Sequence, residues 1–173
     1  EETARFHTRS GLLTAERAGD WIELDFPAKP EEESTVPEGL ARALGAEPVY
    51  VGRSQFDLLV ELESEATVRE LKPDFGRLER VSARGIIVTA RADSERYDFV
   101  SRFFGPRVGV DEDPVTGSAH CVLGPYWQKR LGTDDFIAYQ ASARGGTVRV
   151  GVRGDRVRLG GKAVTVMRGE LSS

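Results

Sequence analysis

The segment DEDPVTGSAHCVLGPYWQKRLG, residues 111–132, runs from a cluster of carboxylates straight into an apolar stretch. The apolar side chains of this stretch recur at helical spacing, which predicts a helix buried on several sides. Gly124-Pro125 is expected to kink or loosen the middle of that helix. The rest of the chain reads as scaffold, so the polar residues before the helix are where the sequence says most about function.

The size and charge of the chain limit its class. Its 173 residues, of which 39% are hydrophobic and 30% charged, suffice for one well-buried core or two small lobes. The net charge of -4 gives no general attraction for nucleic acid or an anionic membrane. No apolar run has the length of a membrane span. We therefore predict no nucleic-acid partner and no membrane partner.

Cysteine and histidine usage bears on metals and on location. The single cysteine, Cys121, cannot form an internal disulfide, and no Cys/His cluster has zinc-ligand spacing. We predict no metal site and a reducing, cytoplasmic location. The N-terminal sequence EETARFHTRS has neither an initiator Met nor a signal-peptide core, so the real beginning of the protein is expected to lie elsewhere.

Periodicity and turn residues outline the elements. Residues 5–26 predict a hairpin of two strands that turn at Gly19-Asp20, and the connector rich in Pro, Glu and Ser that follows marks a lobe boundary. Short helices are predicted at 37–45, 64–71 and 74–79. Strands are predicted at 48–53, 56–62, 85–92, 97–105, 136–141, 147–153, 156–159 and 163–167, with turns at Gly154-Asp155 and Gly160-Gly161.

One stretch of sequence echoes another. Residues 9–24 align without gaps on residues 144–159, sharing Arg, Gly, Gly-Asp and the final Leu, and both read as strand, Gly-Asp turn, strand. If this is a structural duplication, the second copy follows the long helix, whereas the first copy has only eight residues before it. Half of a two-lobed protein would then be absent.

The motif EDPVTGSAHCVLGPYW at 112–127, followed by QASARGG at 140–146, closely resembles the PhzF-like family of phenazine-biosynthesis-type isomerases. TRSG at 8–11 and DFPA at 25–28 are similar to that family too, so the resemblance spans nearly the whole chain. It implies an α+β protein of diaminopimelate epimerase-like fold, with two similar lobes, each an antiparallel sheet wrapped around a central helix. The active site would lie where the two helix N-termini meet.

The resemblance also implies an activity. The characterised reaction isomerises trans-2,3-dihydro-3-hydroxyanthranilic acid by moving a proton, without metal or organic cofactor, and similar proteins are commonly homodimers. One departure is large, because the family's first-lobe strings, like NLSET with its catalytic Glu and like GHAT, do not occur here. The expected organisation is therefore a closing hairpin of a mostly absent first lobe (1–33), a complete second lobe (34–165) and a tail that returns to the first lobe (166–173).

Four residues at the start of the long helix are the candidate site. Backbone amides at a helix N-terminus can hold a carboxylate, and the resemblance implies this role for Gly117 and Ser118, next to Thr116. The alternative is that Thr116 or Ser118 merely caps the helix and Gly117 makes the turn. For Asp113 the resemblance implies a place facing the substrate, where it orients the substrate and shares in proton transfer. Its alternative is a turn residue before Pro114.

Other residues of the segment are weaker candidates for a functional role. Ser118 and His120, two apart on a helix, point in different directions and cannot form a nucleophile and base pair. His120 reads as a packed helix residue, Cys121 as core filling, and Tyr126 and Trp127 as core aromatics. Asp111 and Glu112 read as solvated neighbours of Asp113.

Two functions from different classes follow. The first is a cofactor-independent isomerase that moves a proton on a small carboxylate substrate, of which a cyclic one is a candidate, in a cleft between two lobes. This chain alone is expected to be inactive. The second is a non-catalytic module that binds an anion or a partner, because the first-lobe Glu is absent from this chain.

Overall fold

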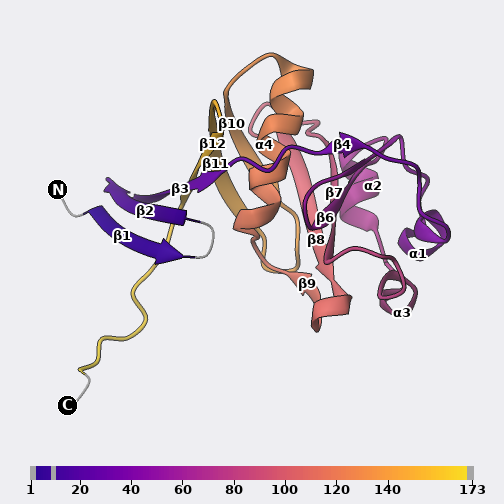
Figure 1. Ribbon diagram of the computed structural model, residues 1–173, viewed down its shortest axis with the longest axis horizontal. Helices are drawn as coiled ribbons and strands as arrows, with labels where there is room; N and C mark the ends of the chain where they lie inside the picture. The colour runs from indigo at the N-terminus through magenta and orange to yellow at the C-terminus, as the bar shows by residue number, and fades with distance from the viewer. Residues whose placement is uncertain (1–2, 9–10, 171–173) are drawn as a thin grey trace.

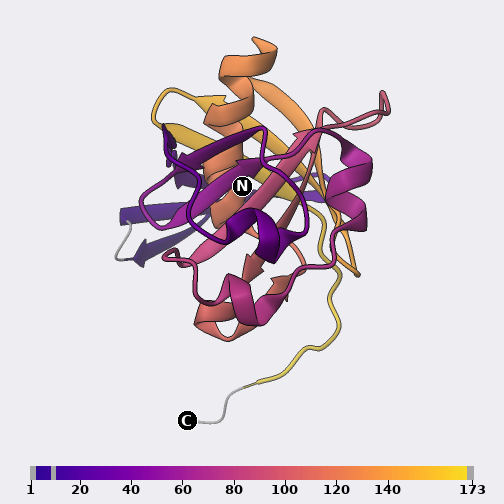
Figure 2. The ribbon, with the colours of Figure 1, turned by 90° about the vertical axis from the view of Figure 1, so that its right-hand side faces the viewer.

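The described residues of the computed structural model, 3–8 and 11–170, form one large curved sheet with helices on both faces (Figures 1 and 2). The strand order is β1-β2-β3-β12-β11-β10-β8-β7-β6-β5-β4, and β9 pairs with β8. The strands are β1 (Thr3–Thr8), β2 (Gly11–Ala18), β3 (Trp21–Pro27), β4 (Glu32–Glu33), β5 (Tyr50–Arg53), β6 (Asp57–Glu61), β7 (Gly85–Arg91), β8 (Phe99–Gly105), β9 (Val110–Asp113), β10 (Asp135–Gln140), β11 (Gly146–Arg153) and β12 (Arg156–Gly161). The helices are α1 (Leu40–Leu44), α2 (Glu65–Glu70), α3 (Phe75–Leu78), the 3₁₀ turn η1 (Pro106–Val108) and α4 (Gly117–Leu131).

The sheet is mixed, so the prediction of an antiparallel sheet is wrong for two strand pairs. β6 pairs with β7 in parallel, and so does β8 with β10. Parallel neighbours need a crossover connection, and both pairs have one. The chain passes through α2 and α3 between β6 and β7, and through β9 and α4 between β8 and β10. The α+β class is confirmed.

Two hydrophobic cores lie on opposite faces of the sheet. Along β6, Leu59 belongs to the core around α4, whereas Leu58 and Val60 belong to the core beneath α1, α2 and α3. β7 alternates in the same way, with Ile87 on the α4 side and Ile86 on the other. This alternation is the period of two that a strand imposes on its side chains. The central strands are therefore buried on both faces.

The long helix α4 runs through Pro125 as one element, Gly117–Leu131. Proline has no N–H, so the carbonyl of Cys121, four residues earlier, loses its helical partner. The backbone N–H of Lys29 donates to that carbonyl at 2.9 Å, which satisfies it from outside the helix. Gly124 gives α4 a close approach to the sheet, because a Cβ there would lie 3.1 Å from Val152. The predicted burial is confirmed, since every residue from 119 to 127 is buried.

The two echoing segments form matching hairpins. β2 and β3 turn at Gly19 with φ +63°, and β11 and β12 turn at Gly154 with φ +61°. Positive φ at both turns explains the shared glycine, which adopts that conformation without strain. The hairpins lie side by side, because β3 pairs with β12. Residues 9 and 10 of the first copy, and of the TRSG stretch, lie outside the described residues.

Three predictions about strands and turns are wrong. Residues 5–18 are not one strand but belong to β1 and β2, which pair with each other before the turn at Gly19-Asp20. Gly160-Gly161 is not a turn but the end of β12, held by pairing with β3, and residues 163–167 have no regular structure. A period-2 pattern does not show where a strand folds back on itself.

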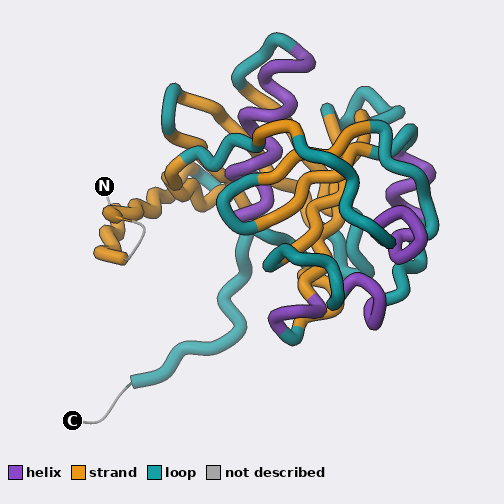
Figure 3. Tube along the Cα trace, turned by 45° about the vertical axis from the view of Figure 1, so that its right-hand side comes forward, coloured by secondary structure: helices purple, strands orange, loops and turns teal. Residues whose placement is uncertain are grey.

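β1 and β2 project from the body of the molecule (Figures 1 and 3). As a consequence Phe6 and Leu12 are 51% and 46% exposed. Phe6 pairs with Leu13, whereas Leu12 pairs with His7, so the exposed apolar side chains are spread over both faces of the ribbon. Among the described residues, no helix has the length and apolar character needed to cross a membrane.

Candidate active site at the start of α4

Asp113 is the last residue of β9, and three residues separate it from α4. Its side chain is half-buried, and its Oδ2 accepts a hydrogen bond from the hydroxyl of Thr116. No hydrogen bond from a described side chain or amide reaches its other oxygen, Oδ1. The carboxylate is therefore fixed through one oxygen and available through the other.

A buried glutamine holds the turn between Asp113 and α4. The Oε1 of Gln140 accepts the backbone N–H of Thr116 at 2.8 Å. Its Nε2 donates to the carbonyl oxygen of Asp113 at 2.7 Å and to Oγ1 of Thr116 at 3.1 Å. Ser142 adds a hydrogen bond from its hydroxyl to the carbonyl of Pro114 at 2.8 Å. The end of β10 thus fixes the turn that carries Asp113.

Glu112, read from the sequence as a solvated neighbour, is in fact a structural residue. It accepts two hydrogen bonds from Arg102, at 2.7 and 3.0 Å, and Arg102 also donates to the carbonyl oxygens of Val68 and Leu71. Both side chains are largely buried, at 11% exposed for Arg102 and 19% for Glu112. The two-point ion pair ties β9 to β8 and to the end of α2. Asp111 is exposed, as expected.

The first turn of α4 is open to solvent at Gly117 and Ser118. Helix geometry leaves the first amides without intrahelical acceptors, and the helix dipole places partial positive charge there. Thr116 occupies the cap position, but within the described part of the chain no side chain caps the helix. The hydroxyl of Thr116 bonds Asp113 instead. The alternative that Thr116 merely caps the helix therefore does not describe this structure.

Ser118 interacts with an ion pair that the sequence analysis missed. Arg84 makes a two-point ion pair with Asp57, at 2.8 and 2.5 Å, and its Nη2 also donates to Oγ of Ser118 at 3.0 Å. Asp57 is 2% exposed, and its hydrogen bonds raise the pKa of Arg84. Because Oγ of Ser118 accepts from a cation, the hydroxyl hydrogen is directed elsewhere and can be donated to a ligand.

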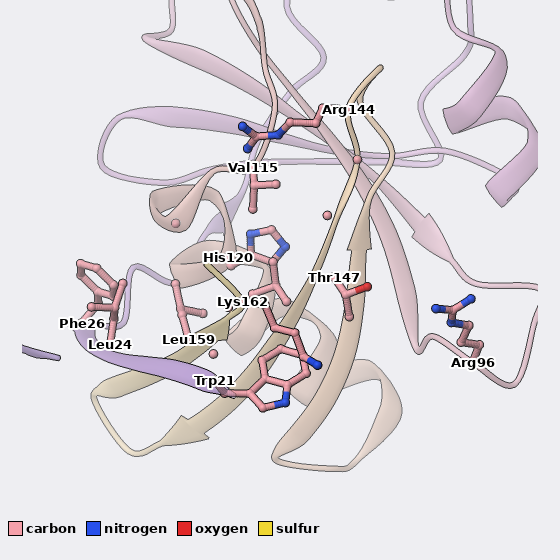
Figure 4. Close-up of a pocket in the computed structure, with 16 residues that line it drawn as sticks. Trp21, Leu24, Phe26, Arg96, Val115, His120, Arg144, Thr147, Leu159 and Lys162 are labelled. Carbon is pink, nitrogen blue, oxygen red and sulfur yellow. The ribbon is translucent and has the colours of Figure 1, made fainter. Parts of the chain in front are cut away.

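Two hollows flank the start of α4. Gly117 borders a cavity of about 840 Å³ together with His120 (Figure 4). Ser118 borders a smaller one of about 200 Å³, on the side of Asp57 and Arg84. The helix start thus lies between two spaces, and the four predicted residues Asp113, Thr116, Gly117 and Ser118 are close neighbours.

His120 and Cys121 are buried, as predicted. Nδ1 of His120 lies 2.8 Å from the carbonyl oxygen of Thr116, whereas Ser118 bonds Arg84, so the two do not form a nucleophile and base pair. Burial lowers the pKa of His120 to about 4 and raises the pKa of the Cys121 thiol to about 12. The cysteine is therefore a protonated core residue. Within the described ranges, no cluster of His, Cys, Asp and Glu has metal-binding geometry.

Three residues of the site escaped the sequence analysis. Gln140 begins the QASARGG stretch that carries part of the family resemblance, but its role depends on a contact across 24 residues. Asp57 begins strand β6 and is followed by three apolar residues, and a buried carboxylate beside them signals an ion pair. Its partner Arg84 is 27 residues away, and nothing in the sequence pattern selects it among the other cations.

The chain is similar to proteins of one family. The family model described as phenazine biosynthesis-like protein, PhzC-PhzF, matches residues 1–169. An uncharacterized isomerase of Halalkalibacterium halodurans is 55% identical over 172 residues. A crystal structure of a PhzF-family phenazine biosynthesis protein from Enterococcus faecalis superposes with a TM-score of 0.91 at 40% identity, and a putative PhzC/PhzF protein from Clostridium difficile with 0.87 at 36% identity.

The relatives are longer than this chain. The match covers 99% of the chain but 65% of the Halalkalibacterium protein. It covers the whole chain and 66% of each of the two structures. The chain thus spans about two thirds of the length of these relatives.

Proposed function

Since the chain belongs to the phenazine biosynthesis-like family, we propose that it carries part of the active site of an isomerase that moves a proton on a small carboxylate substrate. The observation that supports this most is that the first turn of α4 is open to solvent next to Asp113, whose carboxylate is held through one oxygen only. The amides of Gly117 and Ser118, and the hydroxyl of Ser118, would bind the substrate carboxylate. Arg84, which is ion-paired with Asp57, fixes the orientation of that hydroxyl by donating to Oγ of Ser118.

Asp113 would transfer the proton through Oδ1. Thr116 holds Oδ2, so the free oxygen faces a constant direction, which general acid and base catalysis requires. In an isomerisation, one group takes a proton from one carbon and a proton is returned to another, so the composition of the substrate does not change. The second group would be the Glu that the family resemblance implies in an NLSET-like string, a string that does not occur in these 173 residues.

Further proposals concern the cofactor, the oligomeric state, the location, the substrate and the division into lobes. We propose that the reaction needs no cofactor, that the protein is a cytoplasmic homodimer, and that a cyclic carboxylate is a substrate. The division into 1–33, 34–165 and 166–173 belongs with these proposals, with residues 34–165 as the second epimerase-like lobe. Relatives named isomerase support the reaction class.

A non-catalytic binding module is the second candidate. Its ground is that the NLSET-like and GHAT-like strings do not occur in these 173 residues. Such a module would bind a carboxylate at the start of α4 and leave it unchanged.

An exchange assay in D₂O separates the two. The protein expressed from its natural gene, and the 173-residue chain, are incubated with trans-2,3-dihydro-3-hydroxyanthranilic acid and a panel of small cyclic carboxylates. Product formation and deuterium uptake are followed by mass spectrometry. The isomerase predicts deuterium at a substrate carbon with the natural-gene protein, and loss of this uptake in Asp113→Asn. Binding without any uptake across the panel supports the module instead.

A further inference from the structure

The loop between β10 and β11, residues 141–145, is tied by one hydroxyl to the turn that carries Asp113. Oγ of Ser142 donates to the carbonyl oxygen of Pro114 at 2.8 Å and accepts the backbone N–H of Gly145 at 3.1 Å. A serine hydroxyl has one hydrogen and two lone pairs, so both hydrogen bonds form at once. Ser142 therefore joins the loop to the turn.

Close packing keeps the loop against the turn. Gly146, the first residue of β11, lies against Val115 of the turn, because a Cβ on this glycine would collide with Cγ2 of Val115. Gly145 has φ +69°, and a Cβ there would collide with the hydroxyl of Tyr139. Glycine at both positions allows these close approaches. The loop is therefore a fixed support for the turn.

The carbonyl groups of the turn are held one after the other. Gln140 donates to the carbonyl oxygen of Asp113 at 2.7 Å. Ser142 donates to the carbonyl oxygen of Pro114, the next residue. The direction of a carbonyl follows the ψ angle of its residue, and the proline ring fixes the φ angle in between. The main-chain path from Asp113 to Val115 is therefore set, and with it the direction of the Asp113 side chain relative to α4.

Ser142 lies outside the described walls of both hollows that flank the start of α4. It borders a separate hollow, whose walls include Ala143 and Glu112. Both hydrogen bonds of its hydroxyl go to the main chain. An effect of Ser142 on chemistry at Asp113 would therefore pass through the turn and not through contact with a substrate.

We propose that Ser142 is a positioning residue, which directs the free oxygen of the Asp113 carboxylate toward the first turn of α4 by holding the carbonyl of Pro114. This role rests on the proposed function, in which Asp113 transfers the proton. Ser142 changes neither the charge of the site nor its contacts with a substrate. Its loss should therefore slow proton transfer and leave substrate binding largely unchanged.

The test follows deuterium uptake by the protein expressed from its natural gene, with trans-2,3-dihydro-3-hydroxyanthranilic acid or the panel carboxylate that takes up most deuterium. Ser142→Ala removes both hydrogen bonds and should lower kcat about tenfold, below the ~100-fold that a misplacement of about 1 Å can cost, with KM nearly unchanged. Ser142→Thr keeps the hydroxyl and should restore most of kcat. In Asp113→Asn, adding Ser142→Ala should cause no further loss, because the side chain through which Ser142 acts is already disabled.

Ser64→Ala is the matched control. Oγ of Ser64 accepts the backbone N–H of Thr67, three residues on, at 3.1 Å, as Oγ of Ser142 does within its own loop. Because Ser64 caps α2, the variant should lower the free energy of unfolding about as much as Ser142→Ala does, while kcat stays unchanged. If Ser142 merely stabilised the fold, both variants would behave alike.

A second measurement does not depend on turnover. In ¹⁵N spectra of the same protein, Ser142→Ala should shift the backbone amides of Val115 and Thr116 and speed hydrogen exchange at the amide of Gly145, whereas Ser64→Ala should do neither. If the wild-type protein takes up no deuterium with any of these compounds, the proposed function fails, and these amides alone decide whether Ser142 orients the turn.

Three results would overturn the role of Ser142: an unchanged kcat in Ser142→Ala, the same fold loss from this substitution in Asp113→Asn as in the wild type, or unchanged amides at Val115 and Thr116. Full deuterium uptake in Asp113→Asn would instead overturn the proposed function of Asp113.

Discussion

The side chain of Gln140 forms hydrogen bonds to the main chain on both sides of the active-site turn. It accepts the N–H of Thr116 at 2.8 Å and donates to the carbonyl of Asp113 at 2.7 Å. One fully buried carboxamide thus sets the distance between the carboxylate of Asp113 and the first amides of α4. Precise placement of reacting groups accounts for much of enzymatic rate enhancement. The turn is therefore a preorganised element.

Gln140→Leu should lower the free energy of unfolding by about 3 kcal/mol, because it leaves the buried N–H of Thr116 and the part-buried carbonyl of Asp113 without partners. The matched control is Gln128→Leu, which removes one exposed hydrogen bond to Asp134 and should cost less than about 1 kcal/mol. Urea unfolding measures both. If both variants lose the same free energy of unfolding, the hydrogen bonds of Gln140 to the turn contribute no more to stability than one exposed hydrogen bond.

Asp113→Asn should lower isomerisation at least ~100-fold, the scale of one acid–base group. Its free energy of unfolding should change by less than about 1 kcal/mol, because the amide oxygen can still accept from Thr116. Asp111→Asn, an exposed neighbour on the same strand, is the control and should change neither. Parallel losses of turnover and stability in Asp113→Asn would make Asp113 a turn residue.

Local sequence patterns predicted the long helix and the Gly-Asp turns, and they failed where a strand folds back on itself or where contacts are distant. The buried helix and the Gly-Asp turns follow from neighbouring residues, and both are confirmed. The loosening expected at Pro125 does not interrupt α4, because the backbone N–H of Lys29 supplies the hydrogen bond that the carbonyl of Cys121 loses. Lys29 and Cys121 lie far apart in the chain, so no local pattern could indicate their contact.

The site likewise contains residues that a local motif identifies and residues that only distant contacts bring in. Asp113, Thr116, Gly117 and Ser118 are close in sequence, and the motif identifies them together. The residues that hold them, Gln140 and the Asp57–Arg84 pair, come from other strands and loops, so only the folded chain brings them to the site.

Arg84→Met should lower the free energy of unfolding by about 2 kcal/mol, because it strands the buried carboxylate of Asp57; the cost is below that of a fully buried pair since Arg84 is 38% exposed. Adding Asp57→Asn should restore part of the loss. The control Arg77→Met breaks an exposed ion pair with Asp74 and should stay within ~0.5 kcal/mol. A double variant no more stable than Arg84→Met would contradict this role.

Acid should destabilise the protein through His120. Burial lowers its pKa from 6.5 to about 4. Between these values the unfolded chain binds a proton that the folded protein does not, so stability falls as pH drops from about 6.5 to about 4. The loss is about 3 kcal/mol. Urea unfolding across this range should show a shallower pH dependence for His120→Leu, and an unchanged one for the exposed His7→Leu.

The central claim is that the first turn of α4, beside Asp113, binds a small carboxylate. The most direct measurement is a titration of the ¹⁵N-labelled chain with benzoate, following the backbone amides. Saturable shifts are expected, and they should be largest at Gly117 and Ser118. Saturable binding that moves amides elsewhere and leaves these two unchanged, or no saturable binding at all, would contradict it.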